Sequence, residues 1–477
     1  MNNFQLSEQA DPNKIFLTKF SELEGRFEPK FYTDIYVDNE NKLNNSKYKI
    51  NSIQEVTSLV SDGTHFTPKY KDSGIKFISV KNVRKSEINF SNTKYISKKE
   101  ADKLDSRCKP TYGDILLTKV GSIGRAATIC TDERFQIFVS VALLRPNNKL
   151  SSKYLEIALN LNCSYLQYDR VVKGSGVPDL HLEDIRKIKI PIPPKNIQAD
   201  IVAKMDKAYQ DKKDKETQAQ NLLNSIDDYL LDELGIDFPK QTDNSLKARI
   251  FTKKLSEVVG GRFDAEYYQN KYIDFENSLI EKGGYIFLKE LLQMLESGSR
   301  PTGGVGNIES GILSFGGTHV SSDGYIDTSK SKYIPIEYHQ KNLTTTTKIN
   351  DLLLVKDGAT TGKIAIIQKL EHESQNINEH VFLMRLKNNV NPIYLLSYLK
   401  SSFGNMQIKR EITGATVTGL TKDVVNSLKI PLPPIEKQNQ IAKRISKIRD
   451  QAKQLQTEAK NGLEQAKHEV EIMILKG

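Results

Sequence analysis

Two glycine-rich segments carry residue types that could bind a phosphate or a cofactor. Gly358-Ala359-Thr360-Thr361-Gly362-Lys363 resembles a phosphate-binding loop, but three residues rather than four separate its glycines. Such a loop also ends in a serine or threonine that binds magnesium, whereas Ile364 stands at that position. Ser314-Phe315-Gly316-Gly317-Thr318 lacks the second glycine pair and the acidic ribose partner of a dinucleotide-binding loop. We therefore interpret both segments as turns.

Other catalytic arrangements lack a residue that their chemistry requires. Pro178-Asp179, Glu183 and Arg186 resemble part of a nuclease carboxylate set, but the basic residue is misplaced. Amino-methyltransferases hold the target amine with Asp or Asn before Pro-Pro, whereas Ile192 and Leu432 precede the Pro-Pro pairs of this chain. The seven histidines are scattered, so neither a metal site nor a nucleophile with its base can be assigned. We expect no catalytic, cofactor-binding or metal-binding residues in this chain.

The composition indicates at least two domains and a polyanionic partner. A chain of 477 residues is too long for one hydrophobic core. The net charge of +10 favours nucleic acid, because clustered lysine and arginine release counterions from phosphates. A general lysine-rich composition is the alternative explanation of this charge.

The sequence also lacks the features of a membrane or secreted protein. No stretch approaches the roughly 20 apolar residues that span a bilayer, and the first residues do not resemble a signal peptide. Cys108, Cys130 and Cys163 show no Cys-x-x-Cys spacing, and we expect them to be reduced core residues. The sequence thus predicts a cytoplasmic protein without membrane contact.

An internal repeat covers most of the chain and positions the glycine-rich segments. The matching pairs are Ser21-Glu22 and Gly25-Arg26-Phe27 with Ser256-Glu257 and Gly261-Arg262-Phe263, Gly74 through Val83 with Gly311 through Val320, and Lys94-Tyr95-Ile96 with Lys332-Tyr333-Ile334. Asp114-Ile115-Leu116-Leu117 with Lys119 and Gly121 likewise matches Asp351-Leu352-Leu353-Leu354 with Lys356 and Gly358. The last match predicts, in each half, a buried strand that runs into a glycine turn. The repeat predicts two similar domains.

The closest match between the halves marks the start of a long helix. Lys189-Ile190-Pro191-Ile192-Pro193-Pro194 with Gln198 matches Lys429-Ile430-Pro431-Leu432-Pro433-Pro434 with Gln438. Proline forces the preceding residue out of the helical region, so each run should begin as an extended strand. The last proline of each run suits a first helical turn, where no N–H is needed. Each half should therefore end its globular part with a strand and then begin a helix.

Apolar residues at steps of three and four follow both helix starts. The second helix has the fuller apolar seam, formed by Ile441, Ile445, Ile448, Ala452, Leu455, Ala459, Leu463, Ala466, Val470 and Ile474. In the first helix, Lys212 and Lys215 interrupt the seam. They can reach outward on their methylene stems, or meet a carboxylate such as Glu458 in an antiparallel partner. Each helix would be roughly 50–60 Å long at about 1.5 Å per residue. Antiparallel packing would relate the two domains by an approximate two-fold axis, which matches the local symmetry of duplex DNA.

With these features in this order, the sequence resembles the specificity subunits of Type I restriction-modification enzymes. The resemblance rests on the run from Gly261 to Tyr268 and on two Ile-Pro-x-Pro-Pro-x-x-x-Gln helix starts. It implies an α+β fold with two similar mixed α/β target-recognition domains, separated by two long antiparallel coiled-coil helices with pseudo-two-fold symmetry. The expected parts are target-recognition domain 1 (1–193), a first spacer helix (194–234), target-recognition domain 2 (235–433) and a second spacer helix (434–477).

The resemblance also implies a noncatalytic function. Each domain would read one part of a bipartite, gapped sequence in double-stranded DNA, while the helices would fix the gap and dock two adenine methyltransferase subunits. A restriction subunit can join such a complex. S-adenosylmethionine would be bound by the methyltransferase subunits and not by this chain. The alternatives are a recognition subunit of a Type II-like or phage-defence methylation complex, and a coiled-coil scaffold that binds proteins.

DNA recognition requires side chains that reach base edges and cations that hold phosphates, and loops of mixed polarity supply both. The candidates in the first half are Lys69, Lys81, Asn82, Arg84, Lys119, Ser122, Arg125 and Lys173. In the second half they are Arg300, Thr302, Thr318, His319, Lys356, Thr360, Thr361, Lys363 and Arg410. For any one of them, ordinary solvated surface is the alternative interpretation.

Two pairs of candidates stand out because both halves keep a cation beside the same glycine turn. Lys119 corresponds to Lys356, and Arg125 corresponds to Lys363. Retention in both halves favours contact with phosphates, since two domains that read different sequences share only the DNA backbone. Base-reading residues should instead lie where the halves differ, as between residues 65–69 and 300–304.

Overall fold

The computed structural model describes residues 17–18, 20, 23, 27–172, 176–237, 245, 250–258, 263–305, 308–412 and 419–476. The chain divides into two compact units. Unit 1 consists of Met1–Lys215 with Thr457–Gly477, and unit 2 consists of Glu216–Gln456. The Gly-Arg pairs at the two predicted domain starts, Gly25-Arg26 and Gly261-Arg262, lie outside the described residues.

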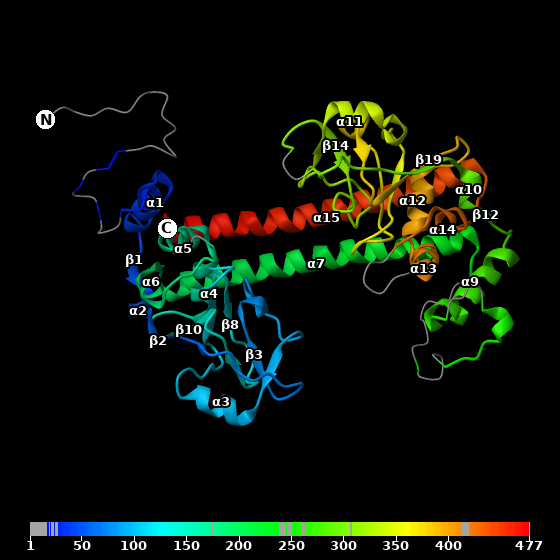
Figure 1. Ribbon diagram of the computed structural model, residues 1–477. Helices are drawn as coiled ribbons and strands as arrows, with labels where there is room; N and C mark the ends of the chain where they lie inside the picture. Colours follow the sequence, from blue (N-terminus) through cyan, green and yellow to red (C-terminus); the bar gives the residue numbers. More distant parts are fainter. Residues whose placement is uncertain are drawn as a thin grey trace. The chain divides into compact units, whose positions relative to one another are not determined.

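Unit 1 combines short strands with helices (Figure 1). Its helices are α1 (Asp34–Asn44), α2 (Ile53–Val56), α3 (Lys98–Asp105), α4 (Ser152–Asn160), α5 (Asn162–Val171) and α6 (Leu182–Lys187). Its strands are β1 (Lys49–Ser52), β2 (Thr57–Asp62), β3 (Ile75–Ile78), β4 (Val83–Arg84), β5 (Glu87–Ile88), β6 (Lys94–Ile96), β7 (Ile115–Thr118), β8 (Ala126–Thr128), β9 (Phe135–Ile137), β10 (Val141–Pro146) and β11 (Lys189–Ile192). The long helix α7 (Lys195–Leu234) follows β11 and continues into unit 2.

Unit 2 repeats this series. Its helices are α9 (Asn270–Glu281), α10 (Leu288–Leu291), α11 (Ile336–Lys341), α12 (Pro392–Lys400), α13 (Ser402–Glu411) and α14 (Lys422–Asn426). Its strands are β12 (Ile286–Phe287), β13 (Leu292–Ser297), β14 (Ile312–Phe315), β15 (Tyr333–Ile334), β16 (Leu352–Val355), β17 (Ile364–Ile366), β18 (Asn376–Ile377), β19 (Val381–Leu386) and β20 (Lys429–Ile430). The second long helix, α15 (Ile435–Leu475), begins here and ends in unit 1.

The strands of the two units pair in the same order. The four-stranded sheets are β2-β10-β7-β8 in unit 1 and β13-β19-β16-β17 in unit 2. The three-stranded sheets are β6-β3-β9 and β15-β14-β18, and each contains one parallel pair. Two-stranded sheets, β1-β11 and β12-β20, complete the match. The repeat in the sequence is therefore a repeat of the fold, which confirms the prediction of two similar mixed α/β domains.

The four-stranded sheet of each unit is buried on both faces. In β7, Ile115 and Leu117 pack into the cluster that contains α4 and α5 residues, while Leu116 packs against the three-stranded sheet. In β16, Leu352 and Leu354 likewise pack into one cluster, and Leu353 packs into another. Burial on both faces explains the uninterrupted apolar runs from which these strands were predicted.

The Pro-Pro-x-x-x-Gln motif joins three elements at the start of each long helix. The Gln198 amide nitrogen donates to the carbonyl of Pro193 at 2.9 Å, and its oxygen accepts from the N–H of Ser151 at 3.2 Å. Gln438 makes the same two contacts in unit 2, at 2.8 and 2.9 Å. Since Ser151 is the N-cap of α4, the glutamine holds α4 against the end of β11 and the start of α7. The motif is thus a structural joint.

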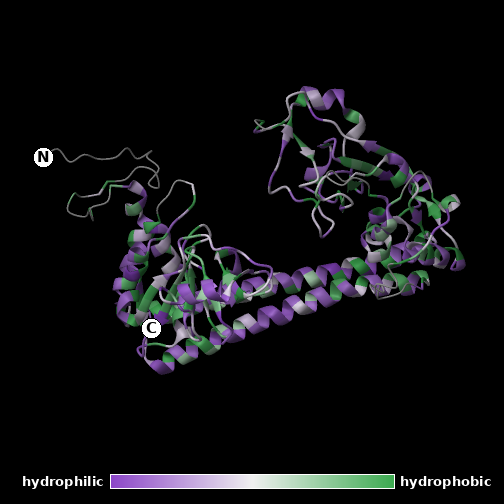
Figure 2. Cartoon of the chain, turned by 60° about the horizontal axis from the view of Figure 1, so that its bottom comes forward, coloured by the Kyte–Doolittle hydropathy of each residue, from purple (hydrophilic) through white to green (hydrophobic). Residues whose placement is uncertain are grey.

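The predicted apolar seam is buried along most of α15. Ile441, Ile445, Val470 and Ile474 are inaccessible to solvent, and hydrophilic residues cover much of the remaining surface of both long helices (Figure 2). The helices begin at Lys195 and Ile435, directly after the last proline of each run and one residue later than predicted.

Within each unit the two long helices pack antiparallel. In unit 1, the Lys215 ammonium lies 2.7 Å from a Glu458 carboxylate oxygen, which confirms the predicted pairing of a seam lysine with Glu458. In unit 2, Lys437 near the start of α15 forms an ion pair with Glu233 near the end of α7.

One prediction about the cysteines is wrong. Cys108 and Cys163 are buried, but Cys130 is exposed because it follows the last residues of β8 at the surface of the domain. The three thiols are free. Across the residues that the structure describes, no helix combines the length and the apolar character needed to cross a bilayer.

Candidate nucleic-acid interface

A buried ion pair occupies the same place in both domains. The Arg145 guanidinium donates to both carboxylate oxygens of Asp114, at 2.8 Å each. Arg385 donates to Asp351 in the same two-bond geometry, at 2.9 and 2.6 Å. Both carboxylates are almost fully buried, directly before β7 and β16. Because a two-bond pair fixes direction as well as distance, the strands that lead to the two glycine turns are held alike in both domains.

Strands β2 and β13 each end at a glycine that sets the path of the following loop. A Cβ at Gly63 would lie 2.0 Å from the carbonyl oxygen of Ile137, and one at Gly298 would lie 2.0 Å from that of Ile377. Only glycine allows backbones to pass this closely. The loops that follow are the first loop (65–69) and the second loop (300–304), which differ in sequence. The two domains therefore present different side chains from equivalent positions.

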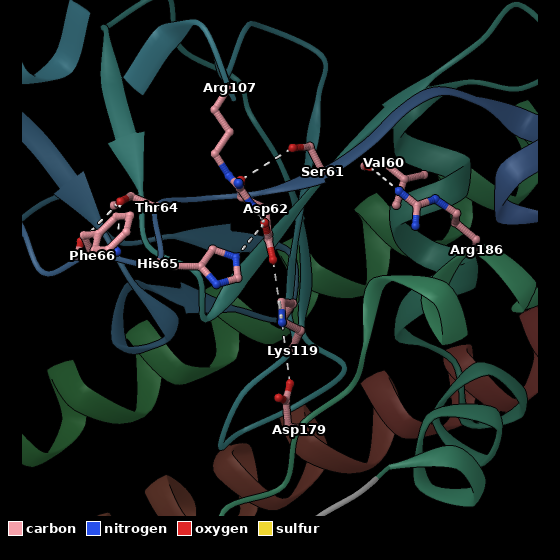
Figure 3. A network of polar contacts seen from close by, with 10 residues as sticks. All are labelled: Val60, Ser61, Asp62, Thr64, His65, Phe66, Arg107, Lys119, Asp179 and Arg186. Carbon is pink, nitrogen blue, oxygen red and sulfur yellow. Dashed lines mark hydrogen bonds and ion pairs between the residues drawn. The ribbon is translucent and has the colours of Figure 1, made fainter. Parts of the chain in front are cut away.

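A buried carboxylate holds the first loop (Figure 3). One oxygen of Asp62 accepts from Arg107 at 2.6 Å and lies 3.4 Å from Nε2 of His65. Its other oxygen lies 3.8 Å from the Lys119 ammonium, which is also 3.5 Å from Asp179. The side chain of Asp62 is only 3% exposed, so this buried carboxylate faces three basic side chains. The network joins the first loop to the glycine turn after β7.

Unit 2 makes the corresponding connection with different residues. Nε of Arg300 lies 2.7 Å from a Glu379 carboxylate oxygen, and Nε2 of His380 lies 3.3 Å from the same oxygen. The other ring nitrogen of His380 pairs with Asp357 in the glycine turn after β16. The second loop is therefore also joined to a glycine turn, although no residue of the network is shared between the domains.

The glycine turns are backbone structures held by the segment before the last helix of each domain. Gly121 donates its N–H to the carbonyl of Pro178 at 2.8 Å, and Leu420 donates to the carbonyl of Lys356 at 2.7 Å. Gly121 and Gly358 have φ values of 77° and 96°, which side chains other than glycine rarely adopt. The glycines that resemble a phosphate loop are thus required by the turn itself.

Three predicted DNA-contacting side chains are buried, so the expectation of accessible loop positions is wrong for them. Asn82 accepts from the N–H of Ser79 at 3.1 Å and closes a capping box. His319 accepts from the N–H of Gly316 at 2.9 Å, and burial lowers the pKa of its imidazole. Lys119 lies within the Asp62 network. Each side chain is buried and held by other groups of its own domain, and we assign all three to the scaffold.

Arg410 also has a structural partner. Its guanidinium lies 4.3 Å from the centre of the Tyr267 ring, and its Nε donates to the Tyr267 carbonyl at 3.0 Å. Arg170 makes the same two contacts with Phe31 in unit 1, at 4.0 and 2.9 Å. The repeated geometry assigns Arg410 to the attachment of the segment before α9.

The other predicted residues remain accessible to different degrees. Exposed residues are Lys69, Lys81, Arg84, Ser122, Arg300, Thr302, Thr318 and Lys363. Half-buried residues are Arg125, Lys356, Thr360, Thr361 and Arg410. Lys356 lies over the Phe382 ring at 5.5 Å, and the Thr361 hydroxyl donates to the Gly358 carbonyl at 2.6 Å. Lys173 lies outside the described residues. Contact of the accessible residues with DNA stays a prediction.

The residues that connect each loop to its glycine turn were not predicted in this role, and Asp179 was considered only as part of a nuclease carboxylate set. They are Asp62, Arg107 and Asp179 in unit 1 and Asp357, Glu379 and His380 in unit 2. Asp62 carried one usable signal, since it is a carboxylate that lies directly before a glycine, Gly63, at the end of a strand. The others come from distant parts of the sequence, and the repeat does not mark them.

Comparison with known proteins identifies the family. A family model described as the Type I restriction modification DNA specificity domain matches residues 43–225 and again 265–465. The Type I restriction enzyme MjaVIII specificity subunit of Methanocaldococcus jannaschii is 23% identical over 371 residues, which are 76% of this chain and 78% of that protein. The Type I restriction enzyme EcoBI specificity subunit of Escherichia coli is 28% identical over 151 residues, 31% of this chain and 32% of that protein.

A solved structure shows the same fold. It comes from work on complex assembly and conformational transition of the type I R-M system, and its chain has a TM-score of 0.51 with 15% sequence identity. The similarity covers 90% of this chain and 97% of that chain. Since the family model matches most of the sequence in two copies, the chain belongs to the family of Type I restriction-modification specificity subunits.

Proposed function

We propose that this chain is a noncatalytic subunit that reads a bipartite, gapped sequence in double-stranded DNA, one part with each domain. One observation carries the proposal. The ion pairs, glycines and sheet order repeat between the domains, whereas the loops at 65–69 and 300–304 differ. A common scaffold with different exposed side chains suits two domains that hold the same duplex but read different bases.

The two long helices would set the distance between the half-sites. They would also dock two adenine methyltransferase subunits, which bind S-adenosylmethionine and rotate the target adenines out of the base stack. A restriction subunit would join the same assembly. The family to which the chain belongs supports these partners, and the long hydrophilic surfaces of α7 and α15 offer room for them.

Changing the first loop tests whether each domain reads its own half-site. Phe66 is 84% exposed and the His65 side chain 55% exposed. Since Arg107 and Lys119 still face Asp62 when His65 is removed, His65→Ala/Phe66→Ala should leave the fold intact. The loss of base contacts should cost about 1–3 kcal/mol of discrimination at the affected base pairs. Sequencing N6-methyladenine in cells that carry the variant and its methyltransferase should therefore show one relaxed half-site, with the other half-site and the gap unchanged.

The matched control is Tyr112→Ala, which removes a 65% exposed aromatic side chain outside the loop of the same domain. We expect its methylated motif to equal that of the unchanged protein. Relaxation of both half-sites by the loop variant would contradict the proposal that each domain reads its own half.

A further inference from the structure

A lysine ammonium lies between a hairpin and a helix end in both domains, but the two domains supply it from opposite sides. In unit 1, Lys85 in the β4-β5 hairpin donates to the carbonyl of Asn160, the last residue of α4, at 3.5 Å. In unit 2, Lys400, the last residue of α12, donates to the carbonyl of Ser322 at 2.5 Å. The donor and the acceptor have exchanged elements.

The internal repeat makes these positions equivalent. Tyr154 in α4 and Tyr394 in α12 each donate a hydroxyl hydrogen bond to the carbonyl of the first proline in the run before the long helix, which places Asn160 and Lys400 at the same point. On the hairpin side, Val83 pairs with Ile88 and Val320 with Ile326, so Lys85 and Ser322 lie two residues past equivalent valines. An ammonium is thus kept in one place although its residue has moved in the sequence.

Each ammonium belongs to a cluster with more cations than carboxylates. The first cation cluster consists of Lys85, Arg125 and Lys467, beside the carboxylate Glu464, which lies 2.6 Å from Lys467. The second cation cluster consists of Lys363, Lys400 and Arg449, beside the carboxylate Asp323. Both clusters therefore combine a long-helix cation with a cation of the glycine turn. Each retains a net positive charge.

The clusters are partly shielded from water yet remain open to a ligand. Burial and the neighbouring cations lower the pKa of Lys85, and the same two causes lower the pKa of Lys400 to about 8. Lys363 is nevertheless exposed and Arg125 half-buried. Like charges held together in this way are stabilised by an anion that reaches them from solvent.

We propose that the two cation clusters bind backbone phosphates of the DNA, one site in each domain. This inference rests on the proposed function. It accounts for the exchange of donor and acceptor, since selection for a charge at one place does not require a particular residue to supply it. It also accounts for the presence of the site in both domains, because phosphates are the part of the target that both half-sites share.

A purely structural role explains less. One ammonium suffices to satisfy the carbonyl of Ser322 or Asn160, and a structural role for that ammonium gives no reason for two further cations beside it. A carboxylate of a partner protein would supply the same charge, and the experiment below distinguishes that source from DNA.

The test moves the ammonium of unit 2 back to the hairpin. The full chain, together with the subunits that copurify with it, is titrated with duplex DNA of arbitrary sequence at several salt concentrations. Lys400→Asn should lower the slope of log Kobs against log salt by about 0.9, which is about an eightfold loss of affinity near 0.1 M salt. Ser322→Lys/Lys400→Asn recreates the arrangement of unit 1 and should restore the slope. Ser322 is exposed, so it accepts a longer side chain.

The control is Lys369→Asn, which removes a 66% exposed lysine of the same unit and should leave the slope unchanged. A lower melting temperature for Lys400→Asn with an unchanged slope would overturn the proposal in favour of a structural role. Weaker copurification of other subunits with an unchanged slope would overturn it in favour of a protein partner. If the unchanged chain shows no salt-dependent DNA binding, the proposed function itself fails. If the unchanged chain binds DNA and Lys400→Asn has the same salt slope, only the phosphate site fails.

The pH dependence provides a second readout. Lys363, Arg449 and Asp323 face Lys400, and Lys400 is the member of this group whose pKa is lowered to about 8. DNA affinity should therefore fall as pH rises through about 8, because the site must take up a proton to bind phosphate. Lys400→Arg keeps its charge throughout this range and should remove that fall. An equal fall in both proteins would count against the site.

Discussion

Replacing Arg385 with alanine is expected to lower the free energy of unfolding of unit 2 by about 3–5 kcal/mol, because it leaves a buried carboxylate without its counter-ion. Asp351 is 2% exposed at its side chain and receives two hydrogen bonds from Arg385. Asp351 also accepts a hydrogen bond from the backbone N–H of Lys348, at 2.7 Å. One N–H cannot replace the charge of a guanidinium.

Denaturant unfolding of the full chain measures this loss. Arg145→Ala should destabilise unit 1 by a similar amount, since Arg145 and Asp114 form the equivalent pair. The surface control is Lys369→Ala, whose pairing with Glu371 is exposed on both sides and should contribute less than about 1 kcal/mol. An Arg385→Ala loss as small as that of the control would show that the buried pair does not hold the strands.

Lengthening the paired helices by one turn should abolish methylation of the original motif and create a motif with a longer gap. In unit 1, Lys215 pairs with Glu458 and Lys204 with Glu469, so Lys212 lies opposite Asn461 in the same register. Four residues inserted after Lys212 need four matching residues at Asn461 to preserve this pairing. The insertion adds about 6 Å, at 1.5 Å per residue, which is close to two base pairs at roughly 3.4 Å each.

Mapping N6-methyladenine in cells that carry the lengthened chain and its methyltransferase measures the gap. Both half-site sequences should persist, because the inserted residues lie outside the two loops. Lys207→Ala changes an exposed helix residue without changing the length and should keep the original gap. A changed half-site with an unchanged gap would contradict the role assigned to the helices.

The backbone of this protein was largely predictable because its signals are local. The proline runs, the apolar strands before Gly121 and Gly358, and the helical seam each lie within one continuous segment, and each was confirmed. The pairing of Lys215 with Glu458 was predictable across segments only because the seam of two antiparallel helices constrains which side chains can meet.

Side-chain environments were less predictable because burial and charge pairing depend on the whole fold. Asn82 and His319 sit in loops that are polar in the sequence, yet both are buried and each hydrogen-bonds the residue three positions earlier, Ser79 or Gly316. Lys119 looked like a free cation because Asp62 lies 57 positions earlier in the sequence, at the end of another strand. A sequence pattern shows the charge of such a residue but not the group that balances it.

The exchange between Lys85 and Lys400 shows a further limit of comparing the two halves. Lys85 aligns with Ser322, and Lys400 aligns with Asn160. Because both aligned residues are uncharged, the alignment alone does not show that the ammonium is retained. Only the contacts between the hairpin and the helix end reveal that both domains keep it. Equivalent chemistry can therefore persist where equivalent residues do not.

The most direct test of the central claim is the map of methylated adenines in cells that carry this chain with its methyltransferase subunit. Two domains that each read one half of the target predict a single asymmetric motif, with two unlike half-sites on either side of a gap of fixed length. Methylation at one continuous motif, or methylation with no fixed gap, would contradict the account.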